Sequence, residues 1–188
     1  MMRNEDIKAG KLLCSKPYIG DPYFERSVVL ITRHDKLVTE GLILNQLIDL
    51  KNPEALEYIS VFSEEFYLGG PVDADHCYFL HRRPDVISNA IHVANDIYFG
   101  GHPDEMESIL NSRQIANNDI RFYIGISVWS PGQLLAEIEN NTWFLHDEDM
   151  GFDAVCAENT DALWGQIVAS KGAPYNLYVH GPESPDLN

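Results

Sequence analysis

The sequence contains no long uninterrupted apolar run. A membrane-spanning helix needs about 18 to 20 such residues, and polar or charged residues break every apolar stretch here well before that length. The first nine residues include Arg3, Glu5 and Asp6, whereas a secretion signal is apolar at this position. We therefore expect a cytoplasmic protein with no membrane contact.

Cysteine is scarce and unpaired in its spacing. Cys14, Cys77 and Cys156 are odd in number and lie in apolar surroundings, which favours buried free thiols in a reducing compartment. The seven histidines show neither an H-x-H nor an H-E-x-x-H pattern, and no cysteine pair lies near them. We therefore expect no metal site and no cofactor.

Positive charge is missing from a long stretch. The net charge is -16, and residues 122–170 contain no Lys or Arg. Eight acidic residues occupy that stretch: Glu137, Glu139, Asp147, Glu148, Asp149, Asp153, Glu158 and Asp161. Such a surface repels phosphate backbones, which argues against direct nucleic-acid binding. It is either a solvated face or a docking surface for a basic protein partner, and charge alone does not separate the two.

Repeats, low-complexity runs and Gly/Ser linkers are also absent. The chain therefore predicts a single domain over residues 1–188, with a core over about 10–172 and a polar, flexible tail over 179–188.

The pattern of β-branched and aromatic residues predicts eight strands and four helices. The strands are expected at 11–15, 27–33, 41–45, 66–68, 77–81, 91–99, 121–128 and 142–145. Helices are expected to start near Asn52-Pro53, His102-Pro103, Ser130-Pro131 and Thr160, and Gly172 should end the last one. This order lacks a regular βαβ alternation, so we predict an α+β fold with a mixed or mainly antiparallel sheet.

Several segments together resemble the AlgH/YqgE-like family of small bacterial proteins. They are 24–30 (FERSVVL), 41–45 (GLILN), 69–72 (GGPV), His81, 129–134 (WSPGQL), Glu137-Ile138 and Trp143. The resemblance covers about residues 10–172. It implies a coiled sheet in an α+β fold and a label of transcriptional regulator, but no catalytic residues. One departure is Val128, which stands where the family generally has glycine; if backbone access there matters, this chain has lost it.

Two motifs are typical of catalytic or phosphate-binding turns, but each departs from its pattern. The run 125–129 (GISVW) is similar to a nucleophile elbow, yet Trp129 stands where that turn needs glycine. Gly69-Gly70-Pro71 lacks the Lys and Ser/Thr of a phosphate loop. It predicts a tight turn in which glycine supplies a positive φ.

Other polar residues each allow a structural and a functional interpretation. His81 precedes Arg82 and Arg83, which either form an anion site or neutralise nearby carboxylates. Asn45 either caps a turn or points into a cleft, and Arg26 is a candidate to pair with a carboxylate such as Asp21.

The segment after Trp129 predicts a capping box, with Ser130 and Gln133 satisfying the first amides of a helix. If that cap were displaced, the amides of Gly132 and Gln133 could hold an anion. Trp129, Trp143 and Trp164 lie in apolar contexts and are expected in the core.

We therefore expect a non-enzymatic accessory or regulatory protein that acts through protein contacts. The alternative is a small anionic-ligand binder or cryptic enzyme. Its pocket or partner cluster would draw on Arg26, Asn45, Gly69, Gly70, Pro71, His81, Trp129, Ser130, Gly132 and Gln133.

Overall fold

The computed structural model describes residues 3–48, 65–148, 150–157 and 161–179. Its ten strands form one sheet system. The strands are β1 (Leu12–Ser15), β2 (Val28–His34), β3 (Thr39–Ile43), β4 (Leu47–Ile48), β5 (Phe66–Leu68), β6 (Val72–His81), β7 (Ile91–Ala94), β8 (Ile97–Phe99), β9 (Ile120–Trp129) and β10 (Trp143–His146).

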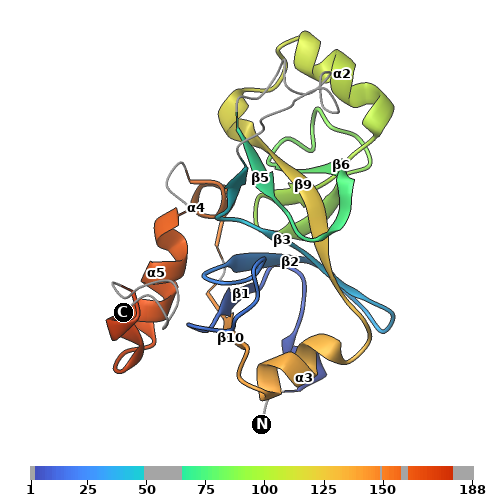
Figure 1. Ribbon diagram of the computed structural model, residues 1–188. Coiled ribbons are helices and arrows are strands. Elements are labelled where there is room, and N and C mark those ends of the chain that lie inside the picture. Colours follow the sequence, from blue (N-terminus) through green and yellow to red (C-terminus); the bar gives the residue numbers. More distant parts are fainter. Residues whose placement is uncertain (1–2, 49–64, 149, 158–160, 180–188) are drawn as a thin grey trace.

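The sheet is mainly antiparallel and does not close on itself. Its order is β10-β1-β2-β3-β9-β6-β8-β7, and β4 joins through β5, which pairs with β9 in the single parallel contact among the described strands. The ten-residue β9 runs from the upper half of the molecule to the lower half (Figure 1). Its first part pairs with β5 and β6 and its last part with β3, so β9 joins the two halves.

Four α-helices lie on the described part of the chain: α2 (Pro103–Asn111), α3 (Gln133–Glu139), α4 (Phe152–Val155) and α5 (Asp161–Ser170). The predicted starts of α2 and α5 agree with these bounds, and Gly172 adopts a φ of +77° after α5. Sequence reasoning missed the short α4. The helix expected near Asn52 and the Thr160 cap lie outside the described residues.

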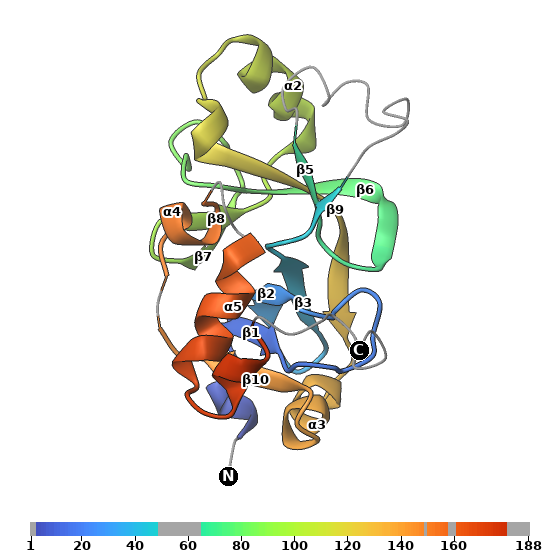
Figure 2. The same cartoon turned by 60° about the vertical axis from the view of Figure 1, so that its left-hand side comes forward.

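The helices cover different parts of the sheet. Helix α2 lies at the top and α3 at the bottom (Figure 1), and α5 lies along β1 (Figure 2). Three apolar clusters result, under α4 and α5, under α2, and beside α3. Trp129, Trp143 and Trp164 are buried, as predicted. The α+β, mainly antiparallel fold is therefore confirmed.

Two of the predicted boundaries were wrong. Residues 91–99 form a hairpin of β7 and β8 rather than one strand, because Asn95 turns the chain with a φ of +46°. Helix α3 begins at Gln133 rather than near Ser130, because Gly132 takes a φ of +77°. Of the tail expected to be flexible, Val179 is described and packs on the core.

Gly69 and Gly70 have a different role from the one predicted. Neither has a positive φ. A Cβ at Gly69 would lie 2.1 Å from the carbonyl oxygen of Gly125, and a Cβ at Gly70 would lie 2.3 Å from the backbone of Ile126. Because these distances are far below van der Waals contact, the glycines allow the connection between β5 and β6 to cross directly over β9.

All three cysteines are free thiols, with Cys14 buried and the other two partly buried. Burial raises the pKa of the Cys14 and Cys77 thiols to about 12. Within the ranges that the structure covers, no helix has the length and apolar content needed to cross a bilayer.

Candidate functional site

The structure does not bring the candidate residues into one pocket. Arg26 and Asn45 line a groove beside α5. The Gly69–Pro71 connection lies over β9, His81 ends β6, and the Trp129–Gln133 segment leads into α3 at the bottom of the molecule (Figure 1). A ligand pocket built from all four places, as the alternative interpretation required, is therefore not formed by the described residues.

His81 is a buried, neutral histidine. Its Nδ1 accepts the amide of Arg83 at 3.0 Å, so its Nε2 carries the proton and donates to the carbonyl of Gly100 at 3.0 Å. Burial lowers the pKa of His81 to about 4. Both ring nitrogens are thus used to hold the end of β6 against the turn after β8.

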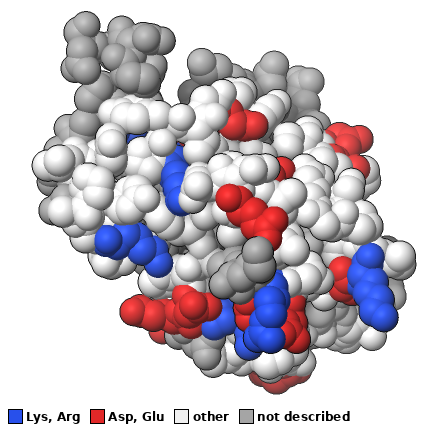
Figure 3. All heavy atoms as spheres, turned by 90° about the horizontal axis from the view of Figure 1, so that it is seen from below, with Lys and Arg blue, Asp and Glu red and all other residues white. Residues whose placement is uncertain are grey.

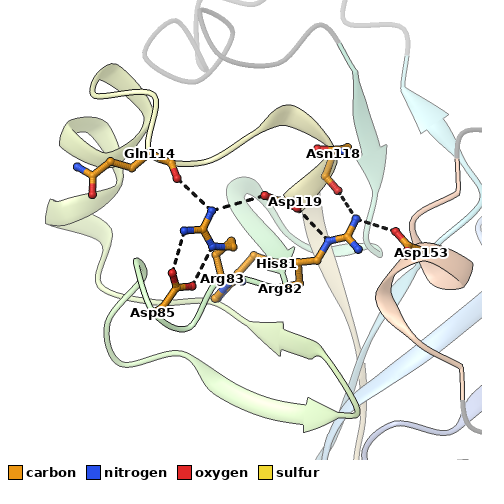
Figure 4. Close-up of polar contacts among 8 residues, drawn as sticks. All are labelled: His81, Arg82, Arg83, Asp85, Gln114, Asn118, Asp119 and Asp153. Carbon is orange, nitrogen blue, oxygen red and sulfur yellow. Dashed lines mark hydrogen bonds and ion pairs between the residues drawn. The ribbon is translucent and has the colours of Figure 1, made fainter.

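The guanidinium groups of Arg82 and Arg83 face carboxylates (Figure 4). Arg83 binds Asp85 through two contacts of 2.8 Å, and Arg82 contacts Asp119 at 3.0 Å and Asp153 at 2.6 Å. Asp153 lies on α4 and Asp119 ends the 3-10 helix Asn117–Asp119. This geometry agrees with the interpretation that Arg82 and Arg83 neutralise nearby carboxylates. Through these ion pairs, Arg82 connects the end of β6 to the 3-10 helix Asn117–Asp119 and to α4.

Ser127 does not have the geometry of a nucleophile. It lies within β9 rather than at a strand-to-helix turn, its side chain is buried, and its hydroxyl donates to the carbonyl of Gly69 at 3.0 Å. The following Val128 is 37% exposed and pairs with Glu40 of β3. The valine side chain is therefore exposed on β9, at the position where the family resemblance implies a glycine.

The segment before α3 forms half of the predicted capping box. The Gln133 side chain accepts the amide of Ser130 at 2.9 Å, but the N-cap residue is Gly132, and it gives no side-chain cap. The positive φ of Gly132 moves Ser130 out of the cap position.

Glu137 forms a clamp that sequence reasoning missed. One carboxylate oxygen accepts the indole N–H of Trp129 at 2.9 Å and that of Trp143 at 2.8 Å, and the other accepts Gln133 at 2.9 Å. The available signal was two tryptophans placed eight residues before and six residues after one glutamate. This clamp fastens α3 to β9 and β10.

A groove with a volume of about 750 Å³ lies beside α5. We call it the α5 groove. Its lining residues are Pro22, Glu25, Arg26, Asn45, Gln46, Ala162, Trp164, Gly165, Gln166, Ala169 and Val179.

Asn45 and Arg26 shape one wall of the α5 groove. The Asn45 amide accepts the Val28 amide at 2.7 Å and donates to the Arg26 carbonyl at 2.8 Å, so it caps the turn as one interpretation expected. Arg26 has a φ of +53°, which non-glycine residues rarely adopt. Its guanidinium lies 5.1 Å from the ring centre of Trp164, while the Asp21 carboxylate accepts the amides of Tyr23 and Phe24.

The other wall is the α5 helix, where the small residue Ala169 is exposed and Ala162 and Gly165 are half-buried. Ala162, Gly165 and Ala169 recur at spacings of three and four, so they share one helix face. Tyr23 and Leu47, which follow the lining residues Pro22 and Gln46 in sequence, are 44% and 57% exposed. The groove therefore has one wall of small side chains, and exposed apolar residues are adjacent in sequence to its other wall.

The acidic residues that the structure describes after position 122 do not form one face. They are distributed from α3 at the bottom to α4 halfway up (Figure 1). Glu137 holds two indoles, Asp153 faces Arg82, and Asp147 lies 3.9 Å from Lys11. Seen from below, Lys and Arg are interspersed with Asp and Glu (Figure 3).

Comparison with known proteins places this geometry in a family. The AlgH-like family model matches residues 12–176. A UPF0301 protein of Chlorobaculum tepidum is 34% identical over 184 residues, covering 98% of this chain and 97% of the relative, and one of Pelodictyon phaeoclathratiforme is 33% identical over the same length and coverage.

Solved structures share the fold. Protein DIP2367 from Corynebacterium diphtheriae superposes with a TM-score of 0.69 at 26% identity, covering 96% of this chain and 95% of the other. The AlgH protein from Pseudomonas aeruginosa, a UPF0301 protein, superposes with a TM-score of 0.67 at 21% identity, covering 92% and 93%. The chain belongs to the AlgH-like, UPF0301 family.

Proposed function

We propose that this chain is a non-enzymatic accessory protein that acts through contacts with a basic protein partner, and that the partner docks in the α5 groove. The observation that carries the proposal is a groove with one wall of small residues, Ala162, Gly165 and Ala169, together with the exposed apolar side chains of Tyr23 and Leu47, which neighbour its lining residues in sequence. Protein interfaces concentrate binding energy in aromatic and large apolar side chains around a pocket that excludes water.

The small residues of α5 affect how closely a partner can approach the wall of the α5 groove. Because the side chains of Ala162 and Ala169 are only a methyl group, a segment of the partner can approach the helix backbone closely there, whereas Val179 of this chain already packs over Gly165. Gln166 is exposed at the groove and offers an amide donor and acceptor to a partner main chain.

Charge supports a basic partner. The net charge of -16 creates a field that attracts basic proteins over long distances and repels nucleic acid. None of the four described α-helices contains a Lys or Arg residue, and a helix that reads DNA relies on such residues for its phosphate and base contacts. A role in transcriptional control would therefore be exercised through a protein.

The polar groups support a role without chemistry of its own. The buried candidates, Ser127 and His81, have their side chains committed to backbone partners. They also lie on separate elements from the α5 groove. Cytoplasmic location follows as part of the proposal, because the partner would be met there.

The test is capture of partners from a lysate of the source organism with Ala169→Arg, which fills the groove and repels a basic segment. Ala136→Arg on α3 is the matched control, because both alanines are exposed on helices. We expect proteins of high isoelectric point to be captured by the wild type and by Ala136→Arg and to be lost with Ala169→Arg. An unchanged set of captured proteins with Ala169→Arg, folded to the same melting temperature, would rule the groove out.

A further inference from the structure

Two lysines converge on one aromatic ring at the lower end of the sheet. The ammonium of Lys16 lies 4.8 Å from the ring centre of Phe144, and that of Lys171 lies 5.7 Å from the same centre. Lys16 donates to the side-chain oxygen of Asn141 at 2.7 Å. Over the ranges that the structure describes, neither ammonium has a carboxylate within 4.0 Å. This is unusual in a chain with 29 acidic and 13 basic residues.

A cleft of about 340 Å³ opens beside Lys16, which lines it, whereas Lys171 lies outside the lining and is placed near it by its contact with Phe144. We call it the lysine cleft; Lys16, Tyr18, Asn141, Tyr175 and Tyr178 are among its lining residues. Tyr18 and Tyr178 meet edge to face at 5.4 Å, and Tyr175 meets Phe144 in the same way at 4.9 Å. Three phenol rings thus surround a volume at the lower end of the range for small-molecule sites.

The backbone of the cleft is held in unusual conformations. Tyr18 has a φ of +62° and Asn141 a φ of +64°; for a bulky residue such as tyrosine this region is a genuine outlier. Glu25 braces the loop that carries Tyr18, accepting the amides of Tyr18 and Gly20 at 3.0 and 3.2 Å. Strained residues that the surroundings hold in place cluster at ligand sites.

The positive charge at the lysine cleft favours a ligand that carries about two negative charges. Burial lowers the pKa of Lys16, since its charge is partly removed from water, and a bound anion would offset that cost. Two ammonium groups match the charge of a phosphate monoester, which is about -1.5 to -2 at neutral pH. Lysine binds phosphate as a point charge, and the tyrosine rings offer faces to a planar group.

We propose that the lysine cleft binds a small phosphate monoester that carries a planar ring, of the size of a nucleoside monophosphate. The phosphate would bind Lys16, with Lys171 beside the same Phe144 ring adding a second positive charge, and the ring of the ligand would contact Tyr18 and Tyr178. This site is distinct from the α5 groove, because the two hollows share no lining residue. The proposal does not depend on the protein partner.

The test is isothermal titration calorimetry of the full chain with adenosine 5′-monophosphate and with p-nitrophenyl phosphate, alongside adenosine and inorganic phosphate. We expect at least one monoester to saturate with a Kd near or below about 1 mM and to bind at least fivefold more tightly than adenosine or phosphate. Lys16→Gln and Lys171→Gln should each weaken that binding at least fivefold, and Lys36→Gln, an exposed lysine on the β2–β3 turn, should change it less than twofold.

The proposal is overturned if neither monoester binds, if adenosine alone binds as tightly, or if both lysine variants keep wild-type affinity. Melting temperatures of the variants separate loss of a ligand contact from loss of the fold. Ala169→Arg should bind the monoester normally, and Lys16→Gln should still capture the protein partner. The two proposals therefore fail independently of each other.

Discussion

Removing the Glu137 carboxylate should destabilise the protein far more than removing other acidic side chains. Its partners, Trp129 and Trp143, are only 2% and 3% exposed, and both indole N–H groups donate to the same oxygen. In Glu137→Ala these two donors lose their partner inside the protein. Solvent reaches them poorly, so each pays a desolvation cost without compensation.

The size of the effect follows from the two contacts. An unsatisfied buried donor costs about 1 to 3 kcal/mol, so Glu137→Ala should lower the free energy of unfolding by about 4 kcal/mol. Glu137→Gln keeps an acceptor oxygen but loses the charge, which makes each hydrogen bond weaker by about 1 kcal/mol. We expect a loss of about 2 kcal/mol for glutamine.

Urea denaturation followed by tryptophan fluorescence measures these differences, and Glu139→Ala on the same helix is the control. Glu139 is exposed, so its substitution should stay within about 0.5 kcal/mol of wild type. In a double-mutant cycle, Trp143→Phe should recover part of the loss in Glu137→Ala, because it removes one stranded donor. If Glu137→Ala and Glu139→Ala were equally stable, the clamp would have no energetic role.

Three further predictions concern positions on other elements. The pKa of His81 is about 4 in the folded protein, whereas its ordinary value is 6.5. Between these pH values the unfolded chain binds a proton that the folded protein does not bind. The free energy of unfolding should therefore fall by up to about 3 kcal/mol as the pH drops from 6.5 to 4. His81→Gln should flatten this part of the pH profile measured by urea denaturation, and His76→Gln, an exposed residue, should not. Gly70→Ala should cost at least about 3 kcal/mol in the same assay, because its Cβ meets backbone that cannot turn aside; a cost below about 1 kcal/mol would contradict the close crossing. Asn45→Ala should lower the melting temperature by stranding the buried amide of Val28, at about 2 kcal/mol, and should weaken partner capture; capture at wild-type level would separate the turn from the α5 groove.

In the folded molecule, part of the negative charge of the acidic stretch is offset by cations from other segments. The stretch 122–170 lacks basic residues, but its carboxylates meet cations from distant segments, such as Arg82 and Lys11. An experiment that neutralises the whole stretch would also remove Glu137, and it would confuse loss of a docking surface with loss of the clamp. Variants limited to Glu139, Asp147 and Glu148, all exposed, avoid this ambiguity.

Much of the fold was predictable because its signals are local. β-branched and aromatic runs marked the strands, Pro103 and Gly172 marked helix ends, and three tryptophans in apolar runs marked the core. These features depend on neighbours a few residues away, so a reader of the sequence has the relevant information. The family resemblance rested on the same motifs and was confirmed.

The roles of the candidate site residues depended on contacts between distant segments. The sequence by itself determined the class of fold, the core tryptophans and the excess of negative charge. Only the tertiary structure decided that Gly69 and Gly70 serve a backbone crossing over β9, that His81 is buried, and that Lys16 and Lys171 meet at Phe144. The physical reason is that strand register and sheet coiling bring together residues that are far apart in sequence, and no local propensity encodes which of them will meet.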